Sequence, residues 1–161
     1  MLTLLQSILQ QWRCRERWVD GVDMGKVVAV WEEELPYTPH QIWQVVTDLA
    51  KWQWRSDLSD CKVLDERIFI EFPKKGKPLR FCTTHFEEPH IWEFQIDSPA
   101  LTGTWKGTFD ATENGGCLVK FIEDVQPRQR LMPNWLAKRF LTAYQAQYFH
   151  DLRNELQSRY N

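Results

Sequence analysis

The stretch LMPNWLAKRFLTAYQAQYFHDLRNELQSRY, residues 131 to 160, carries the clearest structural signal in the sequence. Large apolar residues recur in it at every fourth position: Leu136, Phe140, Tyr144, Tyr148, Leu152 and Leu156. Side chains four residues apart lie on the same face of an α-helix. The spacing therefore predicts a terminal helix of roughly 25 to 30 residues, about 40 Å long.

Before this helix, six consecutive segments are typical of β-strands, because they are short, rich in β-branched and aromatic residues, and separated by turn sequences. They are residues 61–66, 67–72, 78–88, 90–97, 101–112 and 117–127. The turn ENGG at 113–116 contains the strongest hairpin signal. Six strands joined in this way predict an antiparallel meander. Strands of ten to twelve residues span about 33 to 40 Å, so the terminal helix is long enough to lie along the whole sheet.

The segment KVVAVWEEEL, residues 26 to 35, alternates apolar and polar side chains and predicts a further strand. Thr38 is then expected to cap a helix that starts at Pro39, because threonine is a good N-cap and proline fits the first helical position. After about three turns, this helix leads into KWQWRSDL, residues 51 to 58, where two tryptophans stand beside an arginine and an aspartate.

Residues 1 to 23 are interpreted as an N-terminal helical extension, and residues 24 to 161 as the domain. Apolar residues at helical spacing predict a short helix over residues 2 to 13. Met24, followed by Gly25, is interpreted as an alternative translation start, so we expect the fold not to need the extension. The extension would either pack over the sheet or mediate association into a homodimer.

The composition restricts the class of protein. The 161 residues suit one domain with its own core. Nine Trp, nine Phe and four Tyr imply a heavily aromatic core or a concave site lined with rings. A net charge of −2 gives no electrostatic reason to expect nucleic acid as a partner. No apolar run approaches the roughly 20 residues that a membrane span needs, so stable membrane insertion is not expected.

Four widely spaced cysteines, Cys14, Cys61, Cys82 and Cys117, form no C-x-x-C pair. A domain of this size does not need disulfides, so we expect four reduced thiols and a cytoplasmic location. The first basic residues follow the apolar start of the chain, which is the wrong order for a secretory signal.

The order of strand, helix pair, six-stranded meander and long terminal helix resembles the START-like superfamily, in its polyketide cyclase/dehydrase-like branch. The resemblance covers residues 26 to 159 and is carried by residues 34–58, LTGTWKGTF at 101–109, GGCLVKFIEDV at 115–125 and the terminal helix. It implies an α+β helix-grip fold. A curved antiparallel sheet of about seven strands would wrap around the long C-terminal helix, with two short helices after the first strand. It also implies a deep apolar cavity between sheet and helix.

Strand alternation indicates which residues face this cavity. Trp105 on one strand, and Phe121 and Glu123 on the next, are expected to point inward, and Glu123 is the polar exception in an apolar row. The same alternation places Glu71 and His85 on the inner face. A carboxylate in such a place must be paired or must have a raised pKa, because unpaired burial of a charge is costly.

Together with Arg55, these inward polar residues form an expected cluster that either orients a ligand or only satisfies its own hydrogen bonds. In this fold, aromatic residues of the terminal helix would add to the cavity wall. The expected ligand-binding residues are Trp54, Arg55, Glu71, His85, Trp105, Phe121, Glu123, Phe140, Tyr144 and Tyr148. Glu123 and His85 are the catalytic candidates. A buried titratable group with a perturbed pKa is a statistical marker of an active site.

Within KWQWRSDL, Trp52 follows the apolar face of the preceding helix and is expected to be a structural anchor. Trp54 is expected to face the end of the cavity. Arg55 is expected to bind Asp57 or a ligand carboxylate at the rim, where the ion pair would add little stability.

The ring content and the resemblance favour non-catalytic binding or carriage of a small, largely apolar molecule, aromatic or lipid-like. One competing hypothesis is a cyclase or dehydratase that uses Glu123 or His85 as acid-base. Another is a protein-interaction module of the chaperone-activator type, which predicts a filled cavity and a large exposed apolar patch. No cofactor is expected, because the sequence has no G-x-S-x-G, phosphate loop or G-x-G-x-x-G. No metal is expected, because no histidines have ligand spacing.

Overall fold

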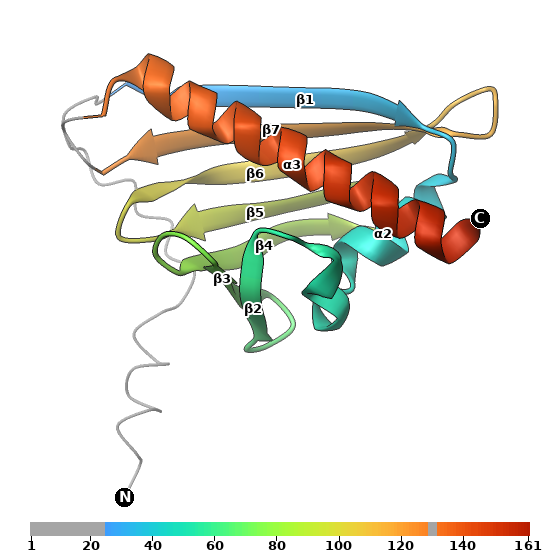
Figure 1. The fold of residues 1–161 in the computed structure, drawn as a ribbon, viewed down its shortest axis with the longest axis horizontal. Helices are drawn as coiled ribbons and strands as arrows, with labels where there is room; N and C mark the ends of the chain where they lie inside the picture. The colour runs from blue at the N-terminus through green and yellow to red at the C-terminus, as the bar shows by residue number, and fades with distance from the viewer. Residues whose placement is uncertain (1–24, 129–131) are drawn as a thin grey trace, which may run out of the picture.

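The computed structural model describes residues 25–128 and 132–161, which form a curved antiparallel sheet crossed by one long helix (Figure 1). The strands follow the order β1-β7-β6-β5-β4-β3-β2. Strands two to seven form the predicted meander, and the first strand pairs with the last. The predicted α+β helix-grip architecture is therefore confirmed.

The strands are β1 (Val27–Leu35), β2 (Leu58–Val63), β3 (Ile68–Pro73), β4 (Leu79–Glu87), β5 (Ile91–Asp97), β6 (Leu101–Ala111) and β7 (Cys117–Pro127). The helices are α2 (Pro39–Thr47), the 3-10 helix η1 (Leu49–Trp54) and α3 (Asn134–Tyr160). The helix predicted over residues 2 to 13 and the boundary before Met24 lie outside the described residues. In the described part of the chain, no helix has both the length and the apolar character needed to span a membrane.

The start of α2 follows the predicted capping chemistry. The Thr38 hydroxyl accepts a hydrogen bond from the backbone N–H of Gln41 at 3.3 Å. The Gln41 side chain in turn accepts one from the backbone N–H of Thr38 at 2.9 Å, which completes a capping box. The chain then continues as the 3-10 helix η1, which is kinked at Lys51. This short kinked segment carries the WQWR motif to the space under α3.

The two halves of α3 pack differently. Phe149, Leu152 and Leu156 in its second half are completely buried, and the Phe149 ring stacks on Trp31 of β1 with centroids 5.6 Å apart. Near its start the helix buries less of its surface, and Phe140 is 59% exposed. Phe140 still lines the cavity under the helix, in agreement with its predicted position, but much of its side chain is exposed. The predicted stripe is completely buried only farther along, at Leu152 and Leu156.

The cysteines differ from the prediction. Cys61 and Cys117 are free thiols, but Cys82 on β4 is disulfide-bonded, so the expectation of four reduced cysteines is wrong. The cytoplasmic location inferred from it stays a prediction.

Candidate functional site

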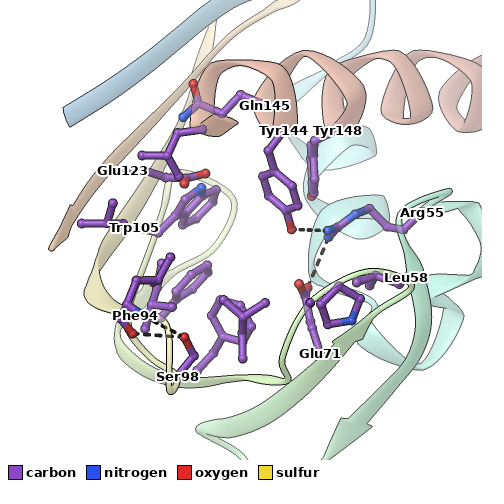
Figure 2. Close-up of a pocket in the computed structure, with 18 of the residues that line it drawn as sticks. Arg55, Leu58, Glu71, Phe94, Ser98, Trp105, Glu123, Tyr144, Gln145 and Tyr148 are labelled. Carbon is purple, nitrogen blue, oxygen red and sulfur yellow. Dashed lines mark hydrogen bonds and ion pairs between the residues drawn. The ribbon is translucent and has the colours of Figure 1, made fainter. Parts of the chain in front are cut away.

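A cavity of about 480 Å³ lies between the sheet and the first half of α3 (Figure 2). Rings make up much of its wall: Trp92, Phe94, Trp105 and Phe121 from the sheet, and Tyr144 and Tyr148 from α3. Phe94 stacks on Trp105 with centroids 4.6 Å apart and nearly parallel planes. A cavity of this size and character is typical of a small-molecule site.

Gly107 makes room for the ring at the centre of this wall. The indole of Trp105 lies so close to the Gly107 backbone that a Cβ at this position would collide with it. The glycine two residues after the tryptophan therefore has a packing role.

Arg55 forms the polar end of the cavity from the C-terminus of η1. Its Nε and Nη2 donate to the two carboxylate oxygens of Asp57 at 2.9 and 2.8 Å, so Asp57 is bound in a bidentate way and is the partner found among the two that were expected. Nη1 donates to Glu71 at 3.2 Å, and Nη2 also donates to the Tyr144 hydroxyl at 2.6 Å (Figure 2). The guanidinium lies over the Tyr148 ring, 4.5 Å from its centroid. Residues from η1, β3 and α3 are thus tied together by one cation.

The electrostatics of this network follow from its burial. Burial lowers the pKa of Arg55, but the carboxylates of Glu71 and Asp57 and the Tyr144 hydroxyl outweigh it and raise the pKa above its ordinary value. Burial also raises the pKa of Glu71, and Arg55 offsets only part of that change. Arg55 is only 7% exposed, so the predicted position at an exposed rim is wrong. The Arg55–Asp57 pair lies within the cavity wall, because Arg55 also binds Glu71 on β3 and Tyr144 on α3.

Trp54 lines the cavity, in agreement with its predicted position, whereas Trp52 departs from its predicted role. Trp54 packs against the core and meets Tyr148 edge to face, with centroids 5.2 Å apart. Trp52 is half-buried and lines the cavity. Trp52 is therefore not the buried anchor that the helical spacing predicted, because η1 continues with a 3-10 rather than an α-helical period.

A second network, which the sequence reasoning missed, fastens the motif to α3. Asp151 is 5% exposed and accepts hydrogen bonds from the backbone N–H and the hydroxyl of Ser56, at 2.8 and 2.7 Å. Gln147 donates to both Asp151 and Ser56. These bonds fix the position of the segment that presents Arg55. A signal existed in the sequence, because Asp151 is a charged residue three positions after Tyr148 and so shares the predicted inward face of the helix.

Glu123 stands on the opposite wall. Pairing between β6 and β7 is unbroken and places Trp105 opposite it, so alternation brings Phe121 and Glu123 to the inner face as predicted. Glu123 is 6% exposed, and its carboxylate points into the cavity (Figure 2). Burial raises the pKa of Glu123 to about 7, although the Gln145 amide beside it and the Arg55 charge favour the ionised form. No salt bridge joins Glu123 to any described residue.

His85 lies outside the cavity. A β-bulge in β4 shifts the register between Thr83 and His85, so His85 pairs with Glu93 on the outer face of the sheet. Its side chain is 50% exposed, and its Nε2 lies 3.5 Å from Glu87. The inward position predicted for His85 is therefore wrong, because an extra residue in a strand reverses the alternation beyond it. Thr83, before the bulge, stays inside and accepts a hydrogen bond from Trp92.

Few of the described side chains that line the cavity are able to take part in a reaction. Burial raises the pKa of the Cys61 thiol to about 12, so this cavity-lining sulfur stays protonated and is a poor nucleophile. Among residues 25–128 and 132–161, no group of three or more His, Cys, Asp and Glu side chains could hold a metal ion. Glu123 is the carboxyl that can exchange a proton or a hydrogen bond with a bound molecule.

The curved sheet, the long helix across it and the cavity between them define a START-like helix-grip protein. The chain belongs to the polyketide cyclase / dehydrase and lipid transport family, whose model matches residues 24–157. No match to a curated protein is found.

Solved structures share the fold at low sequence identity. A START superfamily protein from Mycobacterium smegmatis is 12% identical, with a TM-score of 0.75 over 83% of this chain and 99% of that one. A conserved protein from Geobacillus kaustophilus is 8% identical, with a TM-score of 0.74 over 82% and 96% of the two chains. The Zhui aromatase/cyclase from a Streptomyces species is 9% identical, with a TM-score of 0.72 over 85% and 97%.

Proposed function

We propose that the protein binds and carries a small, largely apolar molecule, aromatic or lipid-like, in the cavity under α3. The observation that carries the proposal is the cavity itself, which encloses about 480 Å³ within a wall built largely of rings. An apolar space of this size gives up many dispersion contacts when it is empty and regains them with an apolar ligand. The family name, which includes lipid transport, is consistent with carriage.

Uptake of a neutral fluorescent probe, N-phenyl-1-naphthylamine, tests this proposal. Ala137 is buried on α3 and lines the cavity, so Ala137→Trp should fill part of the space and weaken probe binding at least about tenfold. Ala143 is exposed on the same helix, so Ala143→Trp makes the same substitution outside the cavity and should leave binding unchanged.

Thermal melts of both variants show whether the fold survives, since overpacking a core costs about 1 to 3 kcal/mol. No probe uptake by the unmodified protein, or equal uptake by both folded variants, would refute binding in this cavity. Native mass spectrometry of freshly purified protein would then identify any small molecule that travels with it.

A second candidate function is a cyclase or dehydratase that uses Glu123 as its acid-base. The observation in its favour is the pKa of Glu123, raised to about 7 by burial, which suits proton transfer near neutral pH. His85 is not part of this candidate, because it faces away from the cavity. A co-purified ligand that loses water on incubation with the protein, but not with the Glu123→Gln variant, would support it.

The third hypothesis, an interaction module of the chaperone-activator type, has less support. It predicted a filled cavity, whereas the space between sheet and helix is large enough for a ligand.

A further inference from the structure

The buried wall of the cavity carries more carboxyl groups than cations. Among the described residues it holds one guanidinium, Arg55, against the carboxyls of Glu71 and Glu123, and Asp57 also pairs with Arg55. Arg55 makes four hydrogen bonds to Asp57, Glu71 and Tyr144, which occupy four of the five N–H groups of an arginine. A ligand carboxylate would therefore find no uncommitted buried cation on this wall.

Glu123 is the group that this arrangement leaves without an opposite charge. Its side chain is more than nine-tenths buried and its carboxylate is directed into the cavity (Figure 2). The amide of Gln145 lies beside it, but an amide carries no net charge. A buried carboxylate without a counterion is costly, so a positive group brought by a ligand would relieve that cost.

The rings next to Glu123 favour the same kind of ligand group. Trp105 is its direct partner across the β6–β7 pair, and Phe94, the partner of Trp105 on β5, stacks on one face of the indole with nearly parallel planes. The faces of such rings attract cations, most strongly when water is excluded. Carboxylate and indole therefore offer one ammonium group both an ion pair and a cation–π contact.

The exposed lysines near the cavity do not replace this missing charge. Lys75 and Lys77 line it from the loop between β3 and β4, where both are exposed. Exposed amines are hydrated and screened by salt, so they contribute little to the field at a buried group.

We propose that the cavity selects ligands that combine an apolar ring system with an amine, whose ammonium group pairs with Glu123 and lies against Trp105. Fatty acids and other carboxylates are disfavoured. This inference rests on the proposed function, because it names the class of molecule that the same cavity takes.

Three probes with the same naphthalene ring test the inference at pH 8: 2-naphthylethylamine, 2-naphthylethanol and 2-naphthylacetate. They present an ammonium, a hydroxyl and a carboxylate, and their affinities can be measured by displacement of N-phenyl-1-naphthylamine. The amine should bind at least about tenfold more tightly than the carboxylate, since hydrogen bonds to charged groups contribute that much. Glu123→Gln should weaken amine binding about tenfold and leave the alcohol unchanged. Glu113→Gln, at an exposed turn, removes the same charge outside the cavity and should change none of the three.

The outcomes separate the two proposals. If the alcohol binds but the carboxylate binds as tightly as the amine, the amine preference is overturned and ligand binding stands. If Glu123→Gln leaves the amine preference intact, the role of Glu123 is overturned. If none of the three displaces N-phenyl-1-naphthylamine, the amine preference is overturned and ligand binding stands; if N-phenyl-1-naphthylamine itself does not bind, both proposals are overturned. The amine-to-carboxylate ratio of the unmodified protein tests the selectivity even if Glu123→Gln fails to fold.

Discussion

Two walls of the cavity each contain a buried carboxyl group, and the two groups differ in whether a cation binds them. Glu71 and Glu123 are each 6% exposed. On the wall made by η1 and β3, Glu71 accepts a hydrogen bond from Arg55, which also binds Asp57 and Tyr144. On the wall made by β6 and β7, Glu123 points into the cavity and forms no salt bridge with a described residue (Figure 2).

The difference teaches that burial alone does not assign a role to a carboxyl. Burial raises the pKa of both groups, but Arg55 offsets the change at close range only for Glu71. The Arg55 network therefore holds η1, β3 and α3 together, whereas Glu123 costs stability and keeps a polar group available to a ligand. Uncompensated groups of this kind are frequent at functional sites.

The largest expected effect is the loss of the Arg55 network. Arg55→Met removes the charge and leaves buried Glu71 without its cation, so the free energy of unfolding in urea at pH 8 should fall by about 3 to 5 kcal/mol. Arg153→Met breaks a more exposed ion pair with Glu33 and should cost about 1 kcal/mol or less. Equal, small losses in the two variants would mean that Arg55 sits at a solvated rim, as the sequence first suggested.

The next largest expected effect is a gain in the free energy of unfolding, and this gain depends on pH. Because the pKa of Glu123 is raised from 4.5 to about 7, the folded state binds its proton more tightly than the unfolded state. The stability due to this group is present below about pH 4.5 and lost as pH rises to about 7, a change of about 3 kcal/mol. Glu123→Gln should therefore stabilise the protein at pH 8 by up to that amount, and the gain should vanish near pH 4.5.

Urea denaturation between pH 4.5 and 8 measures this dependence. Arg55, Glu71 and Gln145 face Glu123, so Glu113→Gln, remote from all of them, is the matched control and should not change the pH profile. Parallel curves for the unmodified protein and Glu123→Gln would show that Glu123 is solvated.

A smaller effect distinguishes the two tryptophans of the motif. Trp54→Ala removes the ring that packs against Tyr148 and should cost about 2 kcal/mol, roughly half the loss for a fully buried ring. Trp52→Ala removes a half-buried cavity-lining ring and should cost about 1 kcal/mol. Denaturant midpoints of the two variants show which substitution destabilises the protein more. A larger loss of stability for Trp52→Ala would mean that Trp52 is the structural anchor.

The smallest effect is expected at His85. Because the bulge in β4 turns this side chain to the outer face, His85→Ala should change stability by less than about 0.5 kcal/mol. It should also leave the affinity for N-phenyl-1-naphthylamine unchanged. A marked loss of affinity would place His85 in the site after all.

The fold was predictable because its signals are local and repeated. The apolar positions of α3, the hairpin turns and the Thr38 cap each specify one element, and their order permits few architectures. Strand alternation placed Trp105, Phe121 and Glu123 correctly because β6 and β7 pair without a break. The same reasoning failed on β4, because nothing local in the sequence marks the bulge before His85.

The Arg55 network was only partly predictable. The pair with Asp57 follows from their separation of two residues, but Glu71 and Tyr144 reach Arg55 through tertiary structure. Gln145 could have been found, because it lies four residues before buried Phe149 and so shares its helix face. A polar residue on a buried face needs a partner, and the Gln145 amide donates to the backbone oxygen of Ala29 at 3.4 Å and stands beside Glu123.

The titration of the Glu123 carboxyl is the most direct test of the contrast between the two walls. Carboxyl ¹³C NMR over a pH series, with the Glu123 signal assigned from its absence in Glu123→Gln, reports the pKa of this one group. The structure predicts a midpoint at about 7 in the free protein, and a shift of that midpoint when a probe occupies the cavity. A midpoint near 4.5 that no probe moves would show a solvated carboxyl outside the ligand site, and would contradict the account.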